Sequence, residues 1–167
     1  MTSTLEVVEA GRLLAFSFED MMKYHGPEAP GGVAHAYKVL ERALPLIAPD
    51  GPPERREIAV QTAFGGPGAR DGIEIVTRAV TGDRYVVDRS LARPERGPNC
   101  ASFVFTLNYR DSEVTLLLRE GYVTDEFIEM ARKLDRTPED NVRLGELKEE
   151  MATRVMSSPA EDVYEVA

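Results

Sequence analysis

The segment from Tyr24 to Gly31 combines residue types that can transfer a proton. His25 lies three residues before Glu28, on a turn rich in glycine and proline between two expected helices. An imidazole titrates near neutral pH, so it can accept or donate a proton, and Glu28 can orient it or act as a second acid–base group. A helix that begins near Pro30 directs its free N–H groups at the same turn and favours an anion there. The alternative is a histidine that only stabilises a helix end, with Glu28 as an ordinary first-turn acid.

A second candidate site is the glycine-rich segment 65–71, between an expected strand and an expected helix. Gly66 and Gly68 let a ligand approach the backbone, and Arg70 adds positive charge next to a helix start that favours an anion. Asp71 or the backbone amides of this segment are candidates to orient or stabilise an anion. The segment lacks the glycine-lysine-serine/threonine ending of a phosphate-binding loop. The alternative is a tight connection whose glycines adopt positive φ angles, with Asp71 only capping the next helix.

Three other features have weaker chemical signals. Arginines recur from Arg84 to Arg96 among acidic residues, and they either select an anionic substrate or are simply solvated. Cys100 is included among the candidate substrate contacts, but no nearby base activates its thiol, and a buried, unreactive role is the alternative. His35 lies on an expected helix close to its apolar stripe, which favours a structural role.

The elements that must position these residues alternate between helices and strands. Ser17 and Thr137 are expected helix caps, because an acidic residue follows each of them three positions later, and Thr124 is the expected cap of the helix at 125–135. Periodic spacing indicates helices at 17–25, 30–47, 71–80, 125–135 and 138–157. It indicates strands at 57–64, 84–88, 101–109 and 112–119, and the tail at 161–166 can add an edge strand. The segment 3–14 is undecided. This order predicts an α+β fold with N-terminal helices, a largely antiparallel sheet with helices on one face, and a C-terminal helical segment with an extended tail. A homodimer is a natural way to cover the other face of the sheet.

Length and composition restrict the class of protein. The 167 residues predict a single domain, with a core at 16–122 and a helical segment at 123–167. The net charge of −9 argues against sequence-independent nucleic-acid binding and against a basic membrane-surface protein. The single cysteine excludes an internal disulfide and a thiolate zinc cage. Without a long apolar stretch or a basic leader, the sequence predicts a cytoplasmic protein with no membrane partner.

The motifs taken together resemble the FmdE-like family, which is named after a component of formylmethanofuran dehydrogenase. The resemblance is carried by YHG at 24–26 with PGGVA at 30–34, by DGIEIVT at 71–77, and by the final helix and tail at 147–166. These motifs and their order cover roughly residues 16–166. The resemblance implies an α+β fold and an interlocked homodimer with its site near the interface between the two copies. It also implies that members with the full pattern hold a metal through histidines and cysteines.

This chain departs from that family at most of the metal-ligand positions. The resemblance places the second histidine of the family at Pro27, its first cysteine at Ala29 and its next cysteine at Gly68. The Thr-Gly-Cys-Thr stretch of the family falls at 77–80, which reads TRAV here. His25 alone falls short of the about four nitrogen or sulfur ligands that zinc requires, although a hard ion such as magnesium needs no thiolate. We therefore expect a cavity that has lost its metal role, and no cofactor.

The sequence thus predicts a small enzyme that performs metal-independent acid–base chemistry on a small, anionic metabolite. The reaction class is isomerisation, elimination, cyclisation or hydration. The alternatives are a non-catalytic small-molecule-binding or accessory protein and a structural interaction module. The candidate catalytic residues are His25, Glu28 and Asp71, and the candidate substrate contacts are Tyr24, Gly66, Gly68, Arg70 and Cys100.

Overall fold

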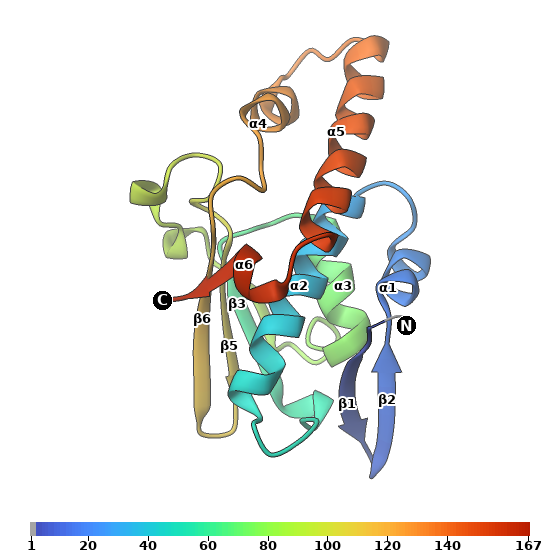
Figure 1. Ribbon diagram of the computed structural model, residues 1–167, viewed down its shortest axis with the longest axis vertical. Helices are drawn as coiled ribbons and strands as arrows, with labels where there is room; N and C mark the ends of the chain where they lie inside the picture. The colour runs from blue at the N-terminus through green and yellow to red at the C-terminus, as the bar shows by residue number, and fades with distance from the viewer. Residues whose placement is uncertain (1–2) are drawn as a thin grey trace.

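The computed structural model describes residues 3–167 and has an α+β fold (Figure 1). The fold class expected from the sequence is therefore confirmed. The helices are α1 (Phe18–His25), α2 (Pro30–Ile47), α3 (Pro67–Thr77), α4 (Asp125–Arg132), α5 (Pro138–Met156) and α6 (Ala160–Val163). The strands are β1 (Leu5–Glu9), β2 (Arg12–Phe16), β3 (Ile58–Thr62), β4 (Tyr85–Val87), β5 (Val104–Tyr109), β6 (Ser112–Leu118) and β7 (Tyr164–Val166).

The main sheet has the strand order β4-β3-β5-β6-β7. Strand β4 runs parallel to β3 after the crossover through α3, and the other neighbours pair antiparallel. Strands β5 and β6 form the expected hairpin, in which Tyr109 pairs with Ser112 and Arg110 turns the chain at a φ of +54°. The C-terminal segment adds an edge strand, because Tyr164–Val166 pairs with residues 116–118. The expected strand 161–166 is therefore confirmed only in its second half, since Ala160–Val163 forms helix α6.

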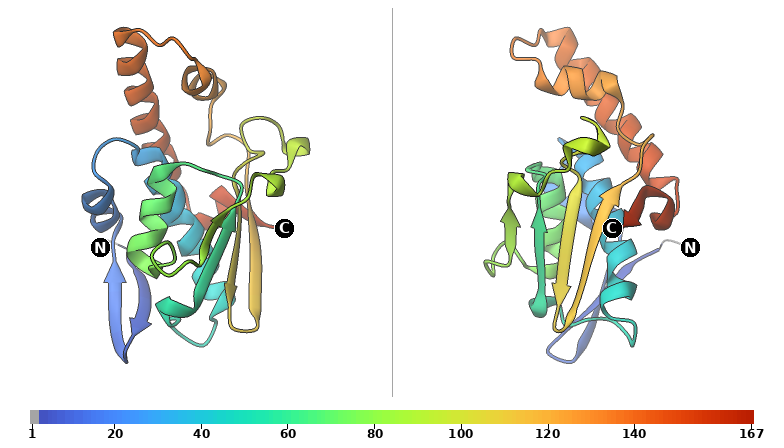
Figure 2. Two further views of the ribbon diagram at one scale, coloured as in Figure 1. Left: turned by 180° about the vertical axis from the view of Figure 1, so that it is seen from behind. Right: turned by 90° about the vertical axis from the view of Figure 1, so that its left-hand side faces the viewer.

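Helix α2 is the central element of the core, and the helices gather on one face of the main sheet (Figure 2). Helix α2 is buried along almost its whole length, because α3 and α5 pack against the sides that the sheet leaves free. The side chains of the strands alternate between the face that packs on the helices and the opposite face. Val60 of β3 and Leu107 of β5 are fully buried on the helix side, whereas Gln61 on the opposite face is exposed.

Helices α4 and α5 form a hairpin that projects from the rest of the molecule (Figure 1). Thr124 and Thr137 cap these helices, each accepting a hydrogen bond from a backbone N–H, as the sequence predicts. No residue of α4 is fully buried, and Leu134 and Val142 near the tip of the hairpin are exposed. The buried residues of α5 begin only at Leu144. The hairpin is therefore joined to the core mainly through the second half of α5.

Two local features differ from the sequence-based expectation. Much of the undecided segment 3–14 lies in the hairpin of β1 and β2, whose turn holds Ala10 and Gly11 at φ angles of +52° and +75°. Helix α3 begins at Pro67, so the prediction of a capping box at Asp71 is wrong. Proline suits the first helical position because its ring fixes φ there and the N–H that it lacks would have no helical partner. Asp71 is consequently an interior residue of α3.

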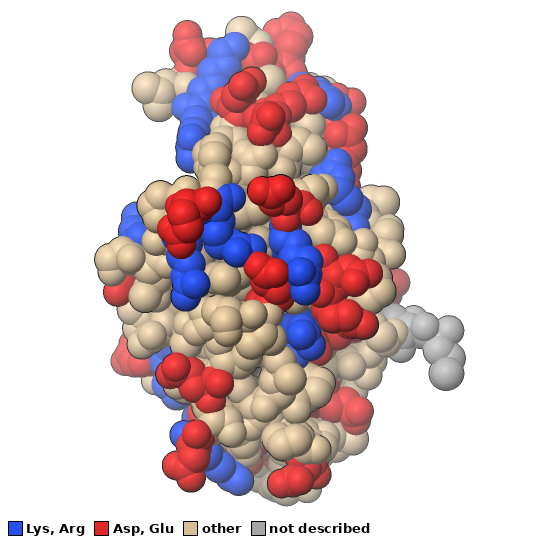
Figure 3. Space-filling view, turned by 60° about the vertical axis from the view of Figure 1, so that its left-hand side comes forward, with Lys and Arg blue, Asp and Glu red and all other residues tan. Residues whose placement is uncertain are grey.

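Charges of both signs are interspersed on the surface. On the face drawn in Figure 3, basic and acidic groups lie next to one another and do not separate into patches of one sign. Arg143 pairs with Glu126 at 2.8 Å, and Arg96 and Arg119 both pair with Glu165, at 2.7 and 2.9 Å. Within the described range 3–167, no helix has the length and apolarity needed to cross a membrane.

Candidate functional site

His25 is the last residue of α1, and the helix ends fix its position. Ser17 and Asp20 form a capping box at the start of α1, in which each side chain accepts a hydrogen bond from the backbone N–H of the other. Gly26 ends the helix at a φ of +91°, a conformation that glycine adopts without strain. The chain then turns into α2 at Pro30. This local structure, predicted from the sequence, brings His25 to the same cavity as the first turn of α2.

The first turns of α2 and α3 lack the caps that the other long helices carry. Ala29 and Gly66 occupy the two cap positions, Pro30 and Pro67 follow them, and neither first turn contains an acidic residue. Helices α1, α4 and α5 begin instead with a serine or threonine cap and have acidic first turns. Because free N–H groups and partial positive charge concentrate at a helix start, the starts of α2 and α3 both favour a negative group beside them.

Close packing between glycines brings these two helix starts together. A Cβ added at Gly68 would lie 2.6 Å from the backbone oxygen of Ala29, and one added at Gly32 would lie 3.0 Å from the backbone nitrogen of Ala69. None of the glycines in segment 65–71 has a positive φ angle, so the interpretation that they provide such angles is wrong. These two glycines instead permit the close approach of α2 and α3, which directs both helix starts at one cavity.

The cavity has a volume of about 440 Å³, which is enough for a small metabolite. Phe64 and Phe103 stack with their ring centroids 4.4 Å apart, and Phe127 of α4 adds to this apolar wall. Met151 of α5 also lines the cavity. The polar lining consists of the first-turn backbone of α2 and α3 and of the side chains of His25, Glu28, His35, Arg70, Asp71 and Lys148. An apolar wall faced by a few polar groups is the usual composition of a small-molecule site.

His25 and Asp71 form a hydrogen-bonded pair in this cavity. The Nδ1 atom of His25 lies 2.8 Å from Oδ2 of Asp71, and Nε of Arg70 donates to the other carboxylate oxygen at 3.3 Å. Because an ionised carboxylate can only accept hydrogen bonds, Nδ1 carries the proton in the neutral imidazole, and Nε2 is then the atom with the lone pair. Nε2 is buried and has no hydrogen-bond partner among residues 3–167. The imidazole is therefore oriented through one nitrogen and available for proton transfer through the other.

Glu28 lies in the same cavity but has a different environment. Its side chain is exposed, and the carboxylate that contacts His25 in the described chain is that of Asp71. The backbone oxygen of Glu28 accepts a hydrogen bond from Nζ of Lys148 at 3.3 Å. This contact holds the ammonium group of Lys148 beside the turn between α1 and α2. The sequence did not indicate Lys148, because it lies 120 residues away from Glu28.

His35 is a second histidine of the cavity, although its sequence context favours a structural role. It lies on α2, one turn after Gly31, and its side chain is wholly buried. Its Nδ1 atom lies 2.8 Å from the hydroxyl oxygen of Tyr164, and its Nε2 atom has no partner in the described chain. Burial lowers the pKa of His35 to about 3 and raises the pKa of Tyr164 well above its ordinary value. The i, i+4 spacing from Gly31 is the one sequence signal that places His35 on the cavity face.

Three other candidates lie apart from the cavity. Tyr24 is 54% exposed and lines a different depression, beside Lys23. Cys100 is buried, its Sγ atom lies 3.8 Å from the backbone oxygen of Arg119, and burial raises the pKa of its thiol. Arg84 donates hydrogen bonds to backbone carbonyls around the start of β3 and the end of α3. Tyr24, Arg84 and Cys100 therefore do not line the cavity that holds His25, and Cys100 lines a separate depression together with Arg96 and Asn99.

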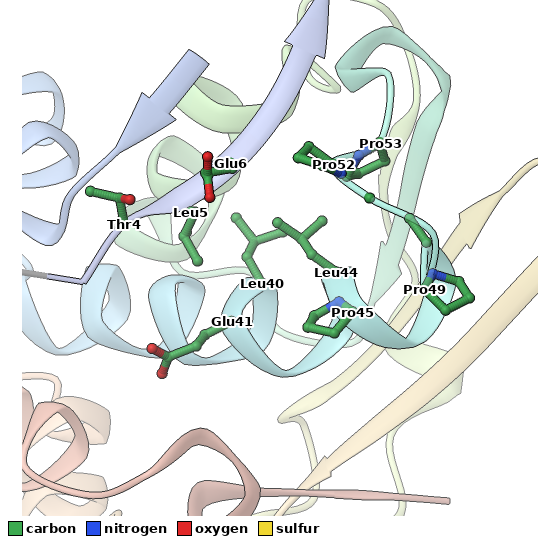
Figure 4. Close-up of a pocket in the computed structure, with 12 residues that line it drawn as sticks. Thr4, Leu5, Glu6, Leu40, Glu41, Leu44, Pro45, Pro49, Pro52 and Pro53 are labelled. Atoms are coloured by element: carbon green, nitrogen blue, oxygen red, sulfur yellow. The ribbon is translucent and has the colours of Figure 1, made fainter. Parts of the chain in front are cut away.

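A second depression, near the N-terminal hairpin, lacks comparable chemistry (Figure 4). It has a volume of about 360 Å³ and lies between β1 and the second half of α2. Leucines and prolines make up most of its wall, including Leu40, Leu44 and Pro45, and its charged residues are Glu6 and Glu41. Among residues 3–167, no histidine, cysteine or basic residue lines it. The cavity at His25 is therefore the better candidate site.

The residues of the His25 cavity do not fit a transition metal. Across residues 3–167, no three histidine, cysteine or acidic side chains converge as metal ligands. Ala29 and Gly68, where the resemblance places family cysteines, both line the cavity beside His25 but supply no side-chain donor.

Comparison with known proteins gives no family for this chain. No protein-family model and no curated protein matches it. The resemblance to FmdE-like proteins therefore depends on the sequence motifs alone.

Proposed function

We propose that this chain is an FmdE-like enzyme that transfers protons on a small anionic substrate without a metal, with His25 as general base and acid. The observation that carries the proposal is the Nε2 atom of His25, which is buried in the cavity without a partner in the described chain while Asp71 holds Nδ1. A histidine that only stabilised the end of α1 would need neither the carboxylate nor a burial that leaves one nitrogen unpaired.

The surroundings of the cavity favour an anionic substrate. The two uncapped helix starts direct partial positive charge into the cavity, and Lys148 adds a full positive charge beside them. Arg70 is already paired with Asp71, so it orients that carboxylate more than it attracts a ligand. With Arg70 paired to Asp71 and Glu28 exposed at the rim, Lys148 and the two helix starts are the positive groups that support a carboxylate or phosphate group on the substrate.

The proposed step needs one group that both removes and returns a proton. The Nε2 lone pair of His25 takes a proton from the substrate, and the resulting imidazolium is stabilised by the ionised Asp71. The phenylalanine wall restricts water, which strengthens these electrostatic interactions. Isomerisation, elimination, cyclisation and hydration all proceed through such a step.

A non-catalytic binding or accessory protein is the second candidate. The observation that favours it is the pair of uncapped helix starts, because these bind an anion without help from an acid–base group.

The two candidates differ in whether protons are exchanged. The full-length protein is incubated with a small-metabolite extract in D₂O, and mass spectrometry identifies anionic metabolites that gain deuterium or change in amount. We expect at least one metabolite to respond to the wild type and to respond at least about 100-fold more slowly to His25→Gln. The control is Lys23→Ala, an exposed change on α1 outside the cavity.

Equal activity of wild type and His25→Gln overturns the catalytic proposal. A metabolite that copurifies with the wild type and with His25→Gln, without any deuterium gain, favours the binding protein.

The proposal includes a homodimer, as the FmdE-like resemblance implies. The projecting hairpin of α4 and α5 supports it, because Leu134 is 101% and Val142 67% exposed there. Light scattering coupled to size exclusion tests this part independently. A dimer that dissociates when both residues are replaced by aspartate is expected, and a wild-type monomer at all concentrations contradicts it.

A further inference from the structure

The structure contains one more unpaired nitrogen in the cavity, on His35. The His35 side chain is wholly buried, lines the cavity and has no hydrogen-bond partner for Nε2 in the described chain. A buried polar atom without a partner destabilises a protein by about 1–3 kcal/mol, so such atoms are exceptional away from functional sites. The ring is held in place by Phe103, whose centroid lies 4.6 Å away, and by the hydroxyl of Tyr164.

The contact with Tyr164 decides which nitrogen of His35 carries the proton. The described chain offers the Tyr164 hydroxyl no acceptor other than Nδ1 of His35, at 2.8 Å. If Nδ1 were protonated, the hydroxyl proton would be buried without an acceptor. If the hydroxyl donates to Nδ1, its proton is satisfied and the imidazole proton is on Nε2. Each arrangement leaves one buried donor without an acceptor, so the count alone does not decide between them. A phenol hydroxyl is a stronger donor than an imidazole N–H, and an imidazole nitrogen is a stronger acceptor than a phenol oxygen, so the hydroxyl donates to Nδ1 and Nε2 of His35 is the N–H donor.

The two histidines therefore present opposite groups to one cavity. Asp71 fixes the proton of His25 on Nδ1 and leaves a lone pair on Nε2, whereas Tyr164 leaves His35 with an N–H at Nε2. A proton acceptor and a neutral donor in one cavity suit the removal of a proton from a carbon next to a carbonyl group, because charge develops on the carbonyl oxygen as the proton leaves. Lys148 and the uncapped helix starts supply a place for an anionic group on the same molecule.

We propose that His35 is a catalytic hydrogen-bond donor to a carbonyl oxygen and that the substrates are small carbonyl compounds carrying an anionic group and an acidic C–H. This inference rests on the proposed function of His25. In the step, Nε2 of His25 takes the proton, the C–H electron pair forms a carbon–carbon double bond, and the carbonyl π pair moves to the oxygen. The oxygen is held by the N–H of His35. Return of the proton to the oxygen gives the enol isomer, and return to the carbon regenerates the carbonyl compound with an exchanged proton, with no oxidant or co-reactant consumed.

The tautomers can be measured without any substrate. The chain has only two histidines, so ¹⁵N-histidine NMR spectra are assigned by His25→Gln and His35→Gln alone. We expect a protonated Nδ1 on His25 and a protonated Nε2 on His35, with His35 remaining neutral from pH 5 to 8. We also expect Tyr164→Phe to remove the preference of His35 for the tautomer protonated at Nε2. A protonated Nδ1 on His35 in the wild type overturns the inference, whatever His25 does.

The catalytic role is tested with phenylpyruvate in D₂O, a probe with a carboxylate, a carbonyl, an acidic CH₂ group and an apolar ring for the phenylalanine wall. NMR follows deuterium incorporation at the CH₂ group. We expect the wild type to catalyse this exchange, and we expect kcat to be about 100-fold or more lower in His35→Leu with little change in KM. The reason is that the donor acts only on the charge that develops in the transition state. His35→Gln, which keeps an N–H donor, is expected to retain more activity than His35→Leu.

The outcomes separate this inference from the function proposed for His25. No wild-type exchange of phenylpyruvate, or equal exchange in wild type and His35→Leu, overturns the carbonyl inference. The function proposed for His25 is then decided separately, by the metabolite experiment with His25→Gln. If His35→Leu fails to fold, Tyr164→Phe serves in its place. A kcat reduced together with a loss of the His35 tautomer preference supports the inference, and an unchanged kcat after that loss contradicts it.

Discussion

The buried His35 predicts a specific loss of stability in acid. Its pKa is about 3 in the folded protein because burial disfavours the charged imidazolium, whereas the ordinary value of 6.5 applies once the chain unfolds. Between these two values, the unfolded chain binds a proton that the folded chain does not. The free energy of unfolding therefore falls as the pH drops below about 6.5, and the loss is complete only near pH 3.

The size of the effect follows from the two pKa values. Each unit between the pH and 6.5 contributes about 1.4 kcal/mol, so lowering the pH from 7 to 5 removes about 2 kcal/mol from the free energy of unfolding. The assay is urea unfolding at both pH values for the wild type and for His35→Gln. Gln is neutral and polar, and it cannot titrate. All other titratable groups are the same in both proteins, so their effects cancel in the difference.

We expect the wild type to lose about 2 kcal/mol more than His35→Gln over this pH range. The m-values of the two proteins should agree, so that the comparison reports stability and not a change in the unfolded chain. If both proteins lose the same free energy to within about 0.5 kcal/mol, His35 is not held neutral in the interior, and the reasoning from its burial is refuted.

The remaining predictions concern packing, orientation and reactivity. Gly68→Ala should lower the free energy of unfolding by about 1–3 kcal/mol in urea, because its new Cβ would meet the backbone oxygen of Ala29 at 2.6 Å. Gly145→Ala, which adds a methyl group to open space on α5, should instead be neutral or raise it by up to about 1 kcal/mol, and equal effects would contradict the packing argument. Asp71→Asn should reduce kcat on the identified substrate by about 10²–10⁴-fold while circular dichroism stays native, because an amide no longer fixes the imidazole tautomer; an unchanged kcat would exclude an orienting role. Cys100 should react with iodoacetamide at pH 8 far more slowly than free glutathione until urea unfolds the chain, because burial raises its pKa, and rapid labelling of the folded protein would argue against that burial.

Local signals in the sequence account for most of the secondary structure. Ser17, Thr124 and Thr137 identify helix starts because each cap is completed by residues within one turn. The N-terminal hairpin was not predicted, because its turn is Ala10-Gly11. A turn with two positive φ angles is normally identified by an asparagine or aspartate before the glycine, and alanine stands there instead.

The candidate site was predicted only in part, because its contacts span long stretches of chain. His25 and Asp71 were both candidate catalytic residues, but their contact spans 46 residues and was not predicted. The sequence instead favoured the nearby Glu28 as the partner of His25 and expected Asp71 to cap a helix. The contact between His35 and Tyr164 spans 129 residues, and no local spacing reveals it. The packing of α2 against α3 decides which polar residues converge on the cavity. This packing depends on close contacts at Gly32 and Gly68.

The position of Phe127 on α4 affects access to the cavity that holds His25. The phenylalanine completes the apolar wall, yet the helix that carries it has no fully buried residue and belongs to the projecting hairpin. Local unfolding of α4 breaks few buried contacts, whereas disturbing α1, α2 or α3 would disrupt the packed core. Amide hydrogen exchange should therefore be faster in α4 than around His25, and each opening of α4 removes Phe127 from the cavity wall.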